Sequence, residues 1–70
     1  MTISVLGAGA FGTALAITFA RGEHNVILWG RNLDAVQNMR NTRENKTYLA
    51  GISFPESLEV THDLKLALSS

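Results

Sequence analysis

Short apolar runs alternate with stretches of helical periodicity along the chain. Strands are expected at residues 2–6, 26–29 and 58–61, and helices at residues 11–21, 32–41 and 63–68. The second run is apolar without alternation, as in a parallel strand that is covered on both faces. The order β-α-β-α-β-α predicts an α/β fold, the first half of a Rossmann-type doubly wound parallel sheet with strands in the order 3-2-1.

Polar residues and glycines predict where these elements end. Asn32 is suited to cap the second helix, and the first helix is expected to end near Arg21 and Gly22, where Gly22 is available for a left-handed cap. Residues 23–25 should form the turn into the second strand. Residues 42–57 are polar or irregular, and an unstructured loop of this length is often functional in a compact domain.

A glycine-rich turn follows the first expected strand. Gly7 permits a tight turn, Gly9 lets the backbone approach a ligand without a Cβ, and Gly12 lets the next helix pack closely on the sheet. The free N–H groups and positive dipole end of that helix then face an anion. Strand, turn, helix and strand fit into about 30 residues, which favours a dinucleotide-binding site. The alternative is a structural turn that binds nothing.

The first expected helix is apolar on nearly all sides. Between Phe11 and Ala20, only Gly12, Thr13 and Thr18 interrupt a row of Phe, Ala, Leu and Ile. Such a helix needs cover on more than one side. The cover would come from further sequence or from a second subunit, so we expect the 70 residues to be a fragment, and a homodimer is left open.

Composition excludes several classes of function. Six basic and six acidic side chains give a formal net charge of zero, which offers no attraction to nucleic acid or to an anionic membrane. There is no cysteine, and no apolar run is long enough to span a membrane. His24 and His62 have no partner at metal-ligand spacing, so we expect turn or capping roles for them and no metal site.

The end of the second strand indicates which dinucleotide would fit. An Asp or Glu there commonly binds the ribose 2′-hydroxyl of NAD, but this chain has Arg31 after Trp29 and Gly30. A guanidinium can hold a 2′-phosphate at two points, so NADP(H) is favoured over NAD(H). The alternatives are a stacking contact with adenine or a solvated arginine. Trp29 is expected in the core.

These motifs together resemble one enzyme family, the bacterial-type NAD(P)-dependent sn-glycerol-3-phosphate dehydrogenases. The resemblance extends over essentially the whole chain. It rests on the glycine turn with the Thr-Ala-Leu-Ala that follows it, on Leu-Trp-Gly-Arg at residues 28–31, and on the segment from Arg43 to Gly51 with its Arg-x-Asn-x-x-Tyr-Leu pattern. Many reductases share the glycine turn, whereas the combination is much more specific.

The resemblance implies roles for individual residues. Ala10 and Phe11 are implied as cofactor contacts in the glycine turn, Arg31 and Asn32 as contacts of the adenosine ribose or its 2′-phosphate, and Tyr48 as a contact from the long loop. The family often has a serine and a larger aromatic residue where this chain has Ala10 and Phe11. Ala10 therefore lacks a hydroxyl that could meet a phosphate.

The resemblance also implies an activity. The implied protein would be a cytoplasmic enzyme that reduces dihydroxyacetone phosphate to sn-glycerol 3-phosphate for glycerophospholipid synthesis. Residues 1–70 would be part of the N-terminal NAD(P)-binding domain, without the rest of that domain and the helical substrate domain. The catalytic lysine lies in that missing part; Lys46 and Lys65 do not match its motif, so we expect no turnover from this chain alone.

Two other functions fit the same residues. One is another reductase of this fold that acts on a different keto or hydroxy acid, which the Tyr48 segment disfavours. The other is a non-catalytic nucleotide-binding or self-associating module. The fold alone does not decide among them, because the same architecture hosts many chemistries.

Overall fold

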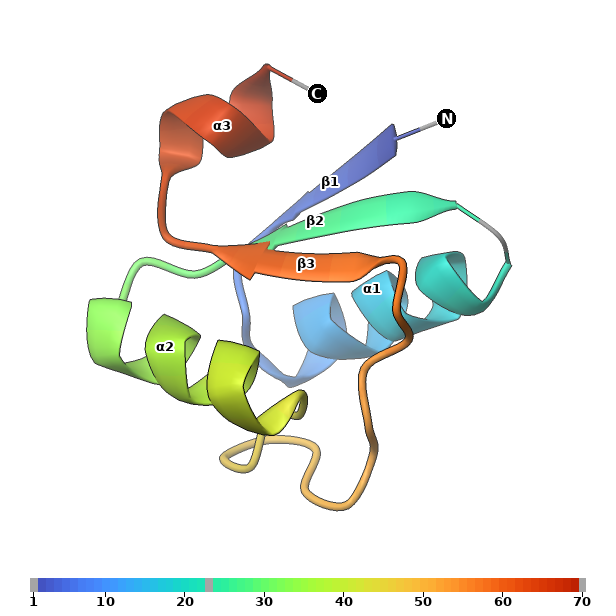
Figure 1. Ribbon diagram of the computed structural model, residues 1–70, viewed down its shortest axis with the longest axis vertical. Coiled ribbons are helices and arrows are strands. Elements are labelled where there is room, and N and C mark those ends of the chain that lie inside the picture. The colour runs from blue at the N-terminus through green and yellow to red at the C-terminus, as the bar shows by residue number, and fades with distance from the viewer. Residues whose placement is uncertain (1, 23, 70) are drawn as a thin grey trace.

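Three parallel strands form the centre of the structure, and helices cover both faces (Figure 1). The computed structural model describes residues 2–22 and 24–69. The elements, in chain order, are β1 (Thr2–Leu6), α1 (Ala10–Arg21), β2 (Asn25–Trp29), α2 (Leu33–Thr42), β3 (Leu58–Thr61) and α3 (Leu64–Leu68). The strands pair in the order β1-β2-β3, which confirms the predicted 3-2-1 arrangement. The α/β class and the element order are confirmed with it.

The two crossover helices lie on one face of the sheet. In Figure 1, α1 and α2 lie below the strands, whereas α3 lies on the opposite face. The Ser4 hydroxyl donates to the Ala67 carbonyl oxygen and so ties β1 to α3. This arrangement follows from two β-α-β units wound in the same direction, after which the chain crosses to the other face.

The core lies between the sheet and the two helices α1 and α2, which cover one of its faces. In the parallel register, Val26 is paired with Leu58 and Leu28 with Val60, and all four side chains are buried. The other buried apolar residues of this cluster are Ala16, Ile17, Ala20, Val36, Met39 and Phe54. Burial of each large aliphatic side chain stabilises the fold by about 1.5–3 kcal/mol. The core thereby packs α1 and α2 against one face of the sheet.

The helix ends follow the prediction at Asn32 and in part at Gly22. The Asn32 side-chain oxygen accepts a hydrogen bond from the Ala35 N–H at 2.9 Å, which confirms it as the cap of α2. Gly22 has a φ of −83°, and its N–H donates to the carbonyls of Thr18 and Phe19. The helix therefore ends where the sequence predicts, but Gly22 does not take the left-handed conformation that was open to it. Glu23 lies outside the described residues.

Arg43 takes the left-handed conformation instead, at the end of α2, with a φ of 57°. Its guanidinium donates to the carbonyls of Pro55 (2.7 Å) and Leu58 (2.9 Å) and lies 5.8 Å from the centre of the Phe54 ring. These contacts close the loop of residues 43–57 across its base. The loop has no helix or strand but is held at both ends.

Exposed apolar residues remain on α1. Phe11 is 78% exposed, whereas Leu15 and Phe19 are partly covered.

No helix in the described ranges combines the length and the apolar character that crossing a membrane requires.

Candidate functional site

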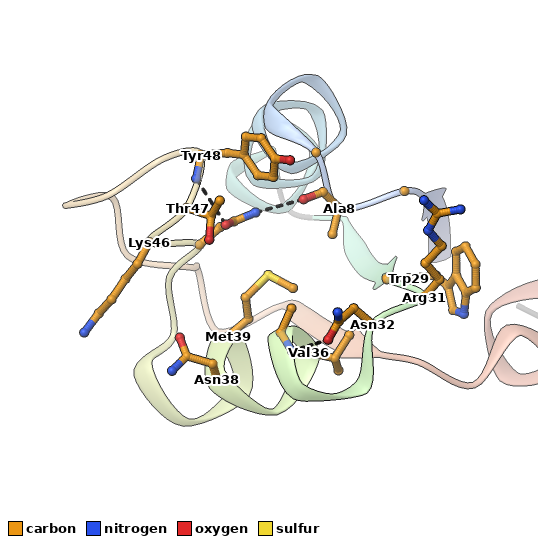
Figure 2. Close-up of a pocket in the computed structure, with 15 residues that line it drawn as sticks. Ala8, Trp29, Arg31, Asn32, Val36, Asn38, Met39, Lys46, Thr47 and Tyr48 are labelled. Atoms are coloured by element: carbon orange, nitrogen blue, oxygen red, sulfur yellow. Dashed lines mark hydrogen bonds between the residues drawn. The ribbon is translucent and has the colours of Figure 1, made fainter.

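A cleft of about 680 Å³ lies at the carboxyl ends of β1 and β2 (Figure 2). Its walls come from the glycine turn, from the first part of α2 and from the loop of residues 43–57. The lining residues are Gly7, Ala8, Gly9, Trp29, Gly30, Arg31, Asn32, Ala35, Val36, Asn38, Met39, Asn45, Lys46, Thr47 and Tyr48. Ligands of open α/β sheets bind at this edge of the strands.

The glycine turn that forms one wall needs its glycines for different reasons. Gly7 has a φ of +116°, a conformation that side chains disfavour. A Cβ on Gly12 would lie 2.0 Å from the Gly7 carbonyl oxygen, so α1 packs directly on the turn. A Cβ on Gly9 would meet no atom within 4 Å. Gly9 therefore leaves its backbone open toward the cleft.

The N-terminus of α1 has no side-chain cap. Gly9 occupies the cap position and contributes no side-chain hydrogen bond, whereas Asn32 caps α2 and Asp63 caps α3. The first N–H groups of a helix have no partner within it, and together with the helix dipole they favour an anion. In the part of the chain that the structure describes, α1 is the one helix whose N-terminus has no side-chain cap.

The end of β2 and the start of α2 form a second wall. Arg31 and Asn32 are exposed and line the cleft there. Trp29 is half-buried, lines the cleft, and donates from its indole N–H to the His62 carbonyl oxygen at 2.9 Å. It is absent from the buried core, so the prediction that it is a core residue is wrong. Gly30, which follows Trp29, has little room for a side chain. A Cβ at this position would lie 3.0 Å from Val36 Cγ2.

The loop of residues 43–57 forms the third wall. Tyr48 lines the cleft with its side chain 57% exposed. Asn45 is almost fully buried and lies behind it, joined to the glycine turn by hydrogen bonds. Figure 2 shows Tyr48 and Lys46 on one side of the cleft and Arg31 on the other. A ligand that contacts both sides would extend from the strand ends to the loop.

The electrostatics of the cleft favour an anionic ligand. Of the side chains that line it, Arg31 and Lys46 are cationic, and none is a carboxylate. The uncapped start of α1 adds partial positive charge at the glycine turn. Within the described ranges, no three His, Cys, Asp or Glu side chains come together in a way that could hold a metal ion.

The structure brings together most of the residues that the sequence singles out. Gly7, Gly9, Arg31, Asn32 and Tyr48 line one cleft. Ala10, Phe11 and Gly12 are not among the lining residues. Ala10 and Phe11 are exposed in the first turn of α1, and Gly12 lies under the turn against Gly7.

Other lining residues were not predicted. Val36 and Met39 are the buried apolar residues of α2 and lie three positions apart, and that helical spacing was the signal that could have placed them near the cleft. Asn45 appears in the sequence only as part of a motif. The two acceptors of its Nδ2 group are 32 and 37 positions away in the sequence, so no local pattern indicates them.

Comparison with known proteins gives a consistent result. The family described as NAD-dependent glycerol-3-phosphate dehydrogenase N-terminus matches residues 2–70. A glycerol-3-phosphate dehydrogenase (NAD(P)+) of Neisseria gonorrhoeae is 54% identical over 68 residues, which are 97% of this chain and 21% of that protein. The enzyme of the same name from Serratia proteamaculans is 45% identical over 69 residues, 99% of this chain and 20% of that protein.

A solved structure is similar as well. The crystal structure of glycerol-3-phosphate dehydrogenase from Coxiella burnetii superimposes with a TM-score of 0.93 at 43% identity, covering 97% of this chain and 21% of that one. The chain thus spans about a fifth of the length of the relatives it matches.

Proposed function

The chain belongs to the family formed by the N-terminal regions of NAD-dependent glycerol-3-phosphate dehydrogenases, and we propose that it forms part of the NAD(P)-binding domain of such an enzyme. The observation that carries the proposal is the uncapped N-terminus of α1, which opens beside Gly9 at the cleft. The curated relatives, whose names specify NAD(P)+, support the cofactor class.

The pyrophosphate would lie at the glycine turn. Gly7 and Gly9 would present backbone to it, Ala10 and Phe11 would offer the first N–H groups of α1, and Gly12 would hold the helix close. These residues fit the group because nothing occupies the space beside Gly9 and no side chain competes for the helix N-terminus. Their part in catalysis is to bind and orient the cofactor.

The adenosine end would lie against α2. Arg31 and Asn32 would bind the ribose and its 2′-phosphate, and the absence of a carboxylate among the lining side chains supports NADP(H) over NAD(H). A carboxylate would instead accept a hydrogen bond from the 2′-hydroxyl of NAD and repel a 2′-phosphate. Tyr48 would contact the cofactor from the loop, with its exposed ring as the contact surface.

The reaction of the whole enzyme would be the reduction of dihydroxyacetone phosphate to sn-glycerol 3-phosphate, a precursor of glycerophospholipids, in the cytoplasm. The bound nicotinamide supplies the hydride for the C2 ketone. The residues of this chain would hold the dinucleotide in place, and the groups that bind substrate and transfer the proton would come from outside these 70 residues.

The test is a turnover assay on the protein from the complete reading frame that contains this chain. NADPH and NADH absorbance would be followed with dihydroxyacetone phosphate as the acceptor, and with a non-phosphorylated ketone as the control. Loss of NADPH that depends on dihydroxyacetone phosphate is the expected result. Oxidation with the control ketone alone would indicate another reductase, and no oxidation with either cofactor would favour a non-catalytic nucleotide-binding module.

A further inference from the structure

Asn45 connects two walls of the cleft. Its Nδ2 donates to the Ala8 carbonyl oxygen and to the Thr13 hydroxyl oxygen, each at 2.9 Å, and its Oδ1 accepts from the Tyr48 N–H at 3.3 Å. The side chain is 4% exposed. One amide thus joins the glycine turn and α1 to the loop that carries Tyr48, as the dashed lines in Figure 2 show in part.

The backbone of Asn45 contributes to the same connection. The Leu49 N–H donates to the Asn45 carbonyl oxygen at 2.7 Å, and the two residues form an isolated antiparallel bridge. The backbone N–H of Tyr48 and that of the next residue, Leu49, therefore both donate to Asn45, which fixes the backbone on both sides of the Tyr48 Cα. Its own side chain is 57% exposed, so packing of the ring contributes little to its position.

We propose that Asn45 is a positioning residue, which fixes Tyr48 relative to the glycine turn so that both can contact one dinucleotide. This inference rests on the proposed function. A ligand that extends across the cleft would otherwise have to order the loop when it binds, and ordering lowers affinity. Asn45 makes that connection before the ligand arrives.

The chemistry of the amide explains why this position holds asparagine. The Ala8 carbonyl requires a donor, and the Tyr48 N–H requires an acceptor. An aspartate keeps the acceptor but turns a carboxylate oxygen toward the Ala8 carbonyl, and an aliphatic residue leaves all three partners without a bond. A buried group of this kind is costly to leave unpaired.

The experiment is a double-mutant cycle for NADPH affinity in the protein from the complete reading frame. The variants are Asn45→Asp, Tyr48→Ala and their combination, with Asn41→Asp as the matched control, because Asn41 is exposed on α2 and does not line the cleft. We expect Asn45→Asp to weaken NADPH binding about tenfold or more when Tyr48 is present, and less than about twofold in the Tyr48→Ala background. An equal factor in both backgrounds would overturn the proposal.

Hydrogen exchange of the ligand-free protein separates this inference from the proposed function. The Tyr48 N–H should exchange about tenfold faster in Asn45→Asp than in the wild type, whereas the Val36 N–H in α2 should keep its rate. Unchanged protection of Tyr48 would contradict the connection whether or not NADPH binds. If the wild type binds neither NADPH nor NADH, the proposed function fails, and the exchange rates still decide the role of Asn45.

A second variant keeps the test decisive if Asn45→Asp does not fold. Thr13→Val removes one acceptor of the amide and leaves the bonds to Ala8 and Tyr48 in place. It should weaken NADPH binding by a smaller factor that again disappears in the Tyr48→Ala background. The same loss in both backgrounds would contradict the proposal.

Discussion

At the scale of single residues, three glycines of one turn lack a side chain for three different physical reasons. Gly7 needs a backbone conformation that other residues disfavour, and Gly12 leaves room for the backbone of Gly7. Gly9 has ordinary backbone angles and open space around it. Nothing in the fold therefore requires glycine at position 9, whereas a ligand against the backbone would.

Substitution of Gly12 and Gly9 by alanine should separate folding from binding. Gly12→Ala places a methyl group 2.0 Å from the Gly7 oxygen, so we expect a loss in unfolding free energy of about 3 kcal/mol or more. Gly9→Ala should change it by less than about 1 kcal/mol and weaken NADPH binding about tenfold. Urea unfolding and NADPH titration measure the two effects, and wild-type affinity in Gly9→Ala would contradict the assignment.

The charge of Arg31 should decide between the two nicotinamide dinucleotides. Arg31→Gln removes a bidentate cation from the cleft wall, and we expect NADPH affinity to fall about tenfold to a hundredfold while NADH affinity changes less than about twofold. Arg40→Gln is the matched control, because Arg40 is exposed on α2 and does not line the cleft. An equal loss for both dinucleotides in Arg31→Gln would exclude a 2′-phosphate contact.

At the scale of elements, side-chain hydrogen bonds hold the loop of residues 43–57 in place. Asn45 joins it to the glycine turn, and Arg43 joins its beginning to its end through the carbonyls of Pro55 and Leu58. The Phe54 N–H also donates to the Arg43 carbonyl oxygen at 2.6 Å. A loop without secondary structure thus has a defined path past the cleft.

Replacement of Arg43 by lysine should loosen the base of this loop. Lysine keeps the charge but cannot donate to two carbonyls in the fixed geometry of a guanidinium, so we expect a loss of about 1–3 kcal/mol in unfolding free energy. Limited proteolysis should then cut faster between residues 43 and 57. The same substitution at the exposed Arg40 should change neither measurement, and an unaltered cleavage rate in Arg43→Lys would show that the contacts do not hold the loop.

The cap of α2 allows a test of Asn32 in which stability and binding move differently. Asn32→Ala removes the acceptor of the Ala35 N–H and should cost about 1 kcal/mol, whereas Asn32→Asp retains an acceptor and should not. The new carboxylate beside Arg31 should nevertheless weaken NADPH binding more than NADH binding. Thermal unfolding and titration provide both readings. Equal destabilisation by Ala and Asp would refute the capping role.

At the scale of the whole molecule, periodicity and turn residues were sufficient to predict the element order and the strand positions. Apolar runs mark strands that are paired on both sides or packed on both faces, and that signal is local. The end of α1 near Arg21 and Gly22 was predicted correctly, but Gly22 is not left-handed, because a glycine permits a left-handed cap without requiring one. Arg43 takes that conformation at the C-terminal end of α2, where contacts across the loop hold it.

The cleft was predictable only in part, for a related reason. Arg31 and the glycines follow strands directly, so the sheet itself places them at one edge. The side-chain N–H groups of Asn45 and Trp29 donate to acceptors that are 32 to 37 positions away, so the sequence offered no spacing to interpret. Long-range hydrogen bonds of this kind become visible only when the loop is placed against the sheet.

A crystal structure of the complete protein with NADPH tests the dinucleotide site most directly. We expect the pyrophosphate within hydrogen-bond distance of the first N–H groups of α1, the 2′-phosphate at Arg31, and Tyr48 in contact with the cofactor. NADPH bound elsewhere, with the cleft beside Gly9 empty, would contradict the claim that these residues form the dinucleotide site.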